Sequence, residues 1–139
     1  AVATAKPDGH TLLLMSNGHA VSASLFKRLP YDAAKDFAPI ATLGFFDLGF
    51  FVAAESPFRT LPALLVHARA HPGQLNVATV SPGSTQHLAA KLFETMAGVD
   101  WLVVPYKGTP AVLAALRSGE VQLAVEIAGP VLPQVAAGA

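Results

Sequence analysis

Three polar segments stand directly after apolar runs, and each contains residues able to bind a small anion. Residues 80–87 read VSPGSTQH, residues 105–109 read PYKGT, and residues 126–129 read EIAG. The first two place Ser or Thr immediately before a helical pattern. The start of a helix presents free N–H groups and about half a positive charge, so it attracts carboxylates and phosphates. We therefore predict an anion site near Ser84 and Thr109, with Thr85 beside Ser84.

Ordinary structural roles remain open for the same residues. Ser84 and Thr109 would equally serve as N-caps of their own helices, which favour Ser and Thr at that position. Gly83 and Gly108 would equally serve as turn residues. His87, in a first helical turn, is typical of a packed histidine that donates to a backbone carbonyl.

Glu126 and the Ser84/His87 pair raise the question of catalysis. A carboxylate at the end of an apolar strand must find hydrogen bonds or water, which favours a position for Glu126 at the mouth of a pocket. A small α/β hydrolase would use these three residues, but Ser84 and His87 share one helical turn with no evident acid to orient the histidine. The sequence also lacks the G-x-S-x-G, H-E-x-x-H, P-loop and dinucleotide-binding motifs. We expect no enzyme activity, no cofactor and no metal site.

The composition excludes several classes of protein. The 139 residues include nine Lys or Arg against nine Asp or Glu, so there is no basic field for nucleic acid. There are no cysteines, which rules out disulfides, thiol catalysis and thiolate metal sites. The most apolar stretch, residues 37–54, is interrupted by Pro and Gly, and a membrane helix needs about 20 apolar residues.

The polar segments are held by a regular alternation of helices and strands in residues 54–139. Apolar runs predict strands at 75–79, 101–104 and 121–126. Helical periodicity predicts helices at 61–70, 86–97 and 110–118 and a last one after 129–130. Thr60 and Thr109 are the expected N-caps of the first and third of these helices. The helix at 86–97 is expected to direct Leu88, Leu92, Phe93 and Met96 inward. This alternation predicts a parallel sheet with right-handed crossovers. Ligands bind beyond the carboxyl ends of such strands, where the polar segments lie.

Residues 1–53 are less regular. Short apolar runs predict strands at 11–15, 40–43 and 48–53, and a brief helix at 20–26 follows a polar loop at 16–19. The chain begins like the last turns of a helix and ends one residue after Gly138, so we expect an internal fragment of a longer protein. A small complete domain with frayed ends is the alternative.

Four motifs resemble, in order, those of one protein family. They are residues 7–14 (PDGHTLLL), 29–40 (LPYDAAKDFAPI), 83–88 (GSTQHL) and 104–109 (VPYKGT). The chain is similar to the TctC/Bug family, the periplasmic solute-binding proteins of tripartite tricarboxylate transporters. The resemblance implies an α/β, periplasmic-binding-protein-like fold whose two lobes close on a ligand. Residues 1–53 would be an incomplete piece of lobe one, and residues 54–139 most of lobe two.

The resemblance also implies a function and a set of ligand contacts. It implies a periplasmic receptor that captures a small carboxylate for a membrane permease, with no nucleic-acid partner. A ligand sensor with the same fold remains an alternative, and exposed phenylalanines of the fragment imply a dimer or a domain swap. The implied contacts are Ser16, Asn17, Gly18, Ser81, Gly83, Ser84, Thr85, His87, Tyr106, Lys107, Gly108, Thr109 and Glu126.

Two of these positions depart from the family pattern. Ser81 stands where the family usually has Gly, and Pro82 follows it, so the backbone of that loop is expected to differ. Glu126 replaces a frequent Asp. Its longer side chain predicts a preference for ligands that carry an amine or an amide over pure polyacids.

Overall fold

The computed structural model describes residues 1–138 and contains two compact units. Unit one is Ala1–Gly44 and unit two begins at Phe45. The boundary therefore lies earlier than the expected one after residue 53. Residues 48–51 belong to unit two because they pair with a strand of its sheet.

Unit two contains a four-stranded sheet whose strand order is β1-β4-β2-β3. Its strands are β1 (Leu48–Phe51), β2 (Asn76–Val80), β3 (Leu102–Tyr106) and β4 (Leu123–Ile127), and its helices are α2 (Leu61–Ala70), α3 (Thr85–Ala97), α4 (Thr109–Arg117) and α5 (Ala128–Ala136). Strands β2, β3 and β4 run parallel, whereas β1 is antiparallel to β4. The predicted alternation and the parallel sheet are thus confirmed.

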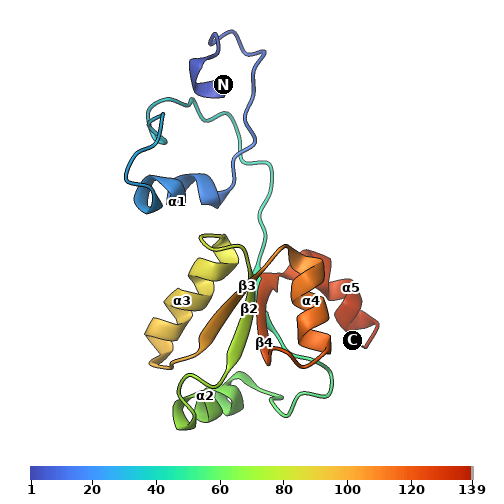
Figure 1. The fold of residues 1–139 in the computed structure, drawn as a ribbon. Helices are drawn as coiled ribbons and strands as arrows, with labels where there is room; N and C mark the ends of the chain where they lie inside the picture. Colours follow the sequence, from blue (N-terminus) through green and yellow to red (C-terminus); the bar gives the residue numbers. More distant parts are fainter. Residues whose placement is uncertain (139) are drawn as a thin grey trace. The chain divides into compact units, whose positions relative to one another are not determined.

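Helices cover both faces of this sheet. In Figure 1, α3 lies on one side of the strands and α4 and α5 lie on the other, and Leu64 of α2 packs in the same core as Ala90 of α3. Successive strand residues point to opposite faces, so Val77 packs in the core under α2 and α3, while Ala78 packs against α4. Leu123 and Ala124 divide in the same way between the two cores. Burial on both faces explains why most residues of these strands are apolar.

Several predicted helix boundaries are confirmed. The Thr60 hydroxyl accepts a hydrogen bond from the Ala63 amide at 3.3 Å, which makes Thr60 the N-cap of α2. Gly98 ends α3 in the left-handed conformation with φ 60°, where a side chain would be disfavoured. The last helix differs from its prediction, because α5 already begins at Ala128 and includes Gly129 and Pro130.

The face that α3 presents to the sheet also differs from the prediction. Leu92 and Met96 were expected inside but are 62% and 78% exposed. Ala90 and Gln86 are the buried residues of the helix instead. The small Ala90 side chain permits close packing on the sheet, and Phe93 stacks on Trp101 with ring centroids 5.8 Å apart. The apolar stripe of α3 is therefore wider than its contact with the sheet.

Unit one contains a 3-10 turn, Val2–Thr4, and the helix α1, Asn17–Leu25. The strands predicted at 11–15 and 40–43 are wrong, because neither segment forms a strand. A strand requires a hydrogen-bonded neighbour, and residues 1–44 contain no strand that could provide one. Among residues 1–138, no helix has the length and hydropathy needed to cross a bilayer.

Candidate functional site

The predicted anion-binding segments of unit two lie at one edge of its sheet. Val80 at the end of β2 pairs with Tyr106 at the end of β3, and Ala78 pairs with Ala124 of the parallel β4. The three strands therefore end at the same edge. Helices α3, α4 and α5 begin there, each within a few residues of its preceding strand.

Ser84 shapes the start of α3. Its Oγ accepts from the His87 amide at 3.1 Å and donates to the Val80 carbonyl at 3.0 Å, so Ser84 is the N-cap. The preceding Gly83 has φ 78°, a conformation that favours glycine. In the described part of the chain, the Thr85 and Gln86 amides have no recorded acceptor. The ordinary role of Ser84 as a cap is thus confirmed, and that role still leaves N–H groups at the sheet edge able to bind an anion.

The prediction that Thr109 is the N-cap of α4 is wrong. Gly108, with φ 92°, is the N-cap, and Thr109 is the first helical residue with no side-chain cap hydrogen bond. The positive φ of Gly108, a conformation that favours glycine, places the N-cap one residue earlier than predicted. The Gly108 carbonyl accepts from the amides of Ala111 and Val112 at 3.1 and 3.3 Å. The two loops are joined by a hydrogen bond from the Ser81 amide to the Tyr106 carbonyl at 3.2 Å.

Glu126, at the end of β4, is fully buried instead of lying at the mouth of a pocket. Its Oε2 accepts from Gln86 Nε2 at 3.2 Å and from the Ile127 amide at 3.0 Å. Its Oε1 is buried and has no hydrogen-bond partner among residues 1–138. Beside this pair, the buried Thr79 hydroxyl lies 3.4 Å from His87 Nδ1.

Sequence reasoning missed Gln86 and Thr79. Both are polar residues within otherwise apolar patterns: Thr79 stands near the end of the β2 run and Gln86 in the first turn of α3. Both are buried. A polar residue on an apolar face needs a polar partner. Their polar character within apolar patterns was therefore the signal that could have identified both residues.

The Tyr106 side chain is directed away from the loops. Its hydroxyl donates to Glu120 Oε1 at 2.8 Å, and Glu120 follows the C-terminal end of α4, near the opposite edge of the sheet. Desolvation raises the pKa of Tyr106, and the hydrogen bond and the negative charge of Glu120 raise it further. Lys107, the next residue, is exposed.

The hydrogen bonds of Ser84, His87 and Glu126 do not form the arrangement that the hydrolase alternative requires. Ser84 Oγ bonds backbone groups, His87 Nδ1 faces Thr79, and Glu126 bonds Gln86 and a backbone amide. Among residues 1–138, no hydrogen bond joins the side chains of Ser84, His87 and Glu126. A nucleophile, a base and an orienting acid need such contacts.

The predicted residues of unit one lie at the start of α1. Ser16 occupies the N-cap position without a side-chain cap hydrogen bond, and Asn17 and Gly18 are the first two helical residues. The predicted loop at 16–19 is therefore largely a helical turn. The Gly18 carbonyl accepts from Ser22 Oγ at 2.7 Å, a local bond within the helix.

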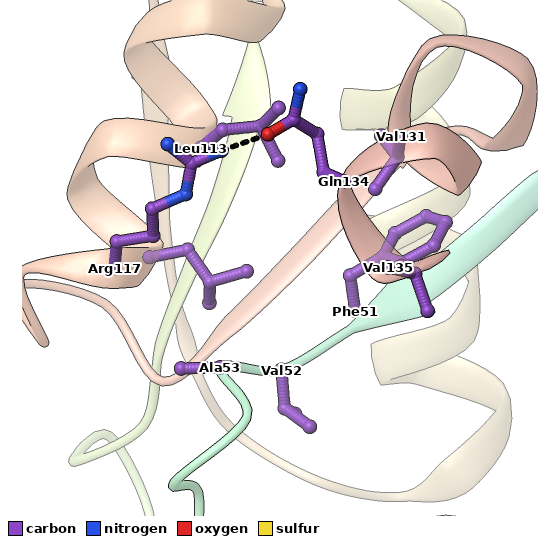
Figure 2. A pocket seen from close by; sticks show the side chains of 9 residues that line it. Phe51, Val52, Ala53, Leu113, Arg117, Val131, Gln134 and Val135 are labelled. Carbon is purple, nitrogen blue, oxygen red and sulfur yellow. Dashed lines mark hydrogen bonds between the residues drawn. The ribbon is translucent and has the colours of Figure 1, made fainter. Parts of the chain in front are cut away.

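Two apolar hollows of unit two lie away from these loops. Figure 2 shows one of about 30 Å³ between β1, α4 and α5, where the Arg117 guanidinium donates to Gln134 Oε1 at 2.6 Å beside Phe51 and Val135. The other, of about 200 Å³, lies between β1 and α3. Neither hollow is lined by a predicted site residue. The candidate anion site within unit two is thus a set of loops at the sheet edge.

Comparisons with known proteins identify one family that covers the whole chain. Residues 1–139 match the family described as the tripartite tricarboxylate transporter family receptor. The UPF0065 protein of the tcbD–tcbE intergenic region in a Pseudomonas species is 36% identical over 125 residues, which are 90% of this chain and 37% of that protein.

Two similar solved structures contain dicarboxylates. MatC from Rhodopseudomonas palustris, with bound malate, is similar with a TM-score of 0.80 and 32% identity, over 99% of this chain and 47% of MatC. An R. palustris protein with adipate gives a TM-score of 0.80 and 31% identity, over 96% of this chain and 46% of that one. The chain therefore spans less than half the length of these relatives.

Proposed function

The chain belongs to the tripartite tricarboxylate transporter receptor family, and from this premise we propose that it captures a small organic carboxylate in the periplasm for a membrane permease. Its fold is that of periplasmic binding proteins. The bound malate and adipate of two similar structures support carboxylates as the ligand class. A binding role without catalysis agrees with the family. It also agrees with the hydrogen bonds of Ser84, His87 and Glu126, none of which joins two of these side chains within residues 1–138.

The observation that carries this proposal is the start of α3 at the carboxyl edge of the sheet. The Thr85 and Gln86 amides there have no recorded acceptor in the described residues. Two adjacent N–H groups at a helix start stabilise a carboxylate without a cationic side chain.

The proposed contacts extend beyond α3. In unit two they include the neighbouring loop ends, and in unit one the start of α1. The set consists of Ser16, Asn17, Gly18, Ser81, Gly83, Ser84, Thr85, His87, Tyr106, Lys107, Gly108 and Thr109. For Tyr106 the proposed contact is its backbone, because its hydroxyl already donates to Glu120.

The decisive experiment removes one N–H without disturbing the helix. Thr85 is the first residue of α3, where proline is favoured. Ser84 has φ −65° and ψ 161°, the extended conformation that a following proline requires. Thr85→Pro therefore deletes the amide donor while α3 keeps its start, and Thr85→Ala deletes only the hydroxyl.

Calorimetric titration of the full chain with malate and with adipate measures the effect. We expect Thr85→Pro to weaken binding roughly tenfold or more, which is about 1.4 kcal/mol. We expect Thr85→Ala to bind nearly as the unchanged chain does. Equal affinity of the proline variant and the unchanged chain would refute the amide site, provided that the unfolding midpoints of the two agree.

A further inference from the structure

We propose that Glu126 is a positioning residue, whose buried carboxylate holds the first turn of α3 against the end of β4 and thereby directs the Thr85 and Gln86 amides. This inference rests on the proposed carboxylate-binding function. Glu126 touches no ligand in this scheme. It acts through Gln86.

One carboxylate oxygen joins the starts of two helices. Glu126 Oε2 accepts from Gln86 Nε2 in the first turn of α3 and from the amide of Ile127, the residue that caps α5. Gln86 and Glu126 are both buried. Solvent therefore competes little for this contact, and buried charge-assisted hydrogen bonds are stronger than exposed ones.

Stability alone does not account for a carboxylate at this position. Burying a carboxylate is unfavourable, and an apolar residue of similar volume is often at least as stabilising as a buried charge. The partnerless Oε1 adds to the unfavourable free energy. The positive ends of α3 and α5 offset part of it. A buried carboxylate at this position is therefore better explained by what it orients than by its contribution to stability.

Helix α3 is attached to the sheet on two sides. Toward β2, Ser84 Oγ donates to the Val80 carbonyl and His87 Nδ1 lies 3.4 Å from the Thr79 hydroxyl. Toward β4, Gln86 donates to Glu126. One attachment would allow the first turn to pivot, whereas two on different strands fix its direction. The free amides belong to this same turn.

Charge makes the proposal testable by a conservative change. A carboxylate near an anion site repels the anion, so a role of Glu126 through its charge would make binding stronger once the charge is removed. A role through position depends only on the acceptor oxygen. Glu126→Gln keeps a carbonyl oxygen for Gln86 and Ile127 and removes the charge, whereas Glu126→Ala removes both.

The experiment compares Glu126→Gln, Glu126→Ala and Gln86→Ala in the full chain. Val125→Ala is the matched control, because Val125 is buried next to Glu126 but belongs to the apolar core. Malate affinity is measured by calorimetry, and amide hydrogen exchange is followed across the first turn of α3. Thermal unfolding of each variant separates lost stability from lost binding.

We expect Glu126→Ala and Gln86→Ala each to weaken malate binding about tenfold and to speed amide exchange in the first turn of α3. The variant that combines Glu126→Ala with Gln86→Ala should bind malate no more weakly than Glu126→Ala alone, because the two side chains act through one contact. Glu126→Gln should stay within about threefold of the unchanged chain. Unchanged affinity and exchange in Glu126→Ala, or an equal loss of affinity in Val125→Ala, would overturn the positioning role alone. An unchanged chain that binds neither malate nor adipate nor any other small carboxylate would overturn the proposed function, and the positioning role with it.

Discussion

Unit one and unit two contain similar apolar runs but use them differently. In unit two, the runs at β2 and β4 are paired and buried on both faces. In unit one, residues 11–15 read TLLLM, yet Leu14 is 79% exposed and none of residues 1–44 is buried. The difference shows that an apolar run becomes a strand only where a second strand and a covering helix are available.

The largest expected difference between the units is the loss of unfolding free energy when a leucine side chain is truncated. Leu123 is buried in unit two under α2 and α3, so Leu123→Ala should cost about 2–5 kcal/mol. Leu14→Ala should change stability by less than about 0.5 kcal/mol because its side chain is exposed. Urea denaturation measures both. An equal loss from the two substitutions would contradict the contrast between the units.

Self-association, expected from the exposed phenylalanines of a fragment, should depend on the edge of the unit-two sheet. Within the described residues, β1 is paired on one side only and Phe50 is 39% exposed. An open apolar edge promotes pairing between copies. Sedimentation velocity should show concentration-dependent dimers that Phe50→Lys weakens. A monomer at every concentration would refute this prediction.

Removing hydroxyls at two helix starts should have unequal effects. Thr60→Ala removes the cap of α2 and should cost about 1 kcal/mol. Thr109→Ala should cost much less, because Gly108 occupies the N-cap position of α4. Chemical denaturation of the two variants side by side measures the difference. A loss of about 1 kcal/mol in Thr109→Ala would restore Thr109 as the cap.

The smallest expected effect concerns alkaline pH. Burial and Glu120 raise the pKa of Tyr106 above its ordinary value of 10.0. Its contribution to stability is therefore present below the unfolded-state pKa and is lost as pH rises through the folded-state pKa. Tyr106→Phe should remove this decline in unfolding free energy, measured at roughly pH 9 to pH 11. An identical decline in the variant would show that other groups cause it.

Much of the site in unit two follows from local sequence. The segments at 80–87 and 105–109 lie at one sheet edge because they end parallel strands, which the alternation of elements already predicted. Ser84 caps α3 as its position indicated. The attachment of Gln86 to Glu126 was not predictable, because 40 residues separate the two in the sequence.

The sequence by itself determined the family, the order of helices and strands in unit two, and turn positions such as Thr60 and Gly98. These signals reside within a few neighbouring residues, where backbone preferences and capping act. Tertiary structure alone decided which apolar runs became strands, which face of α3 is buried, and that Glu126 lies inside. Those outcomes depend on contacts between segments far apart in the chain, and local preference carries no information about such partners.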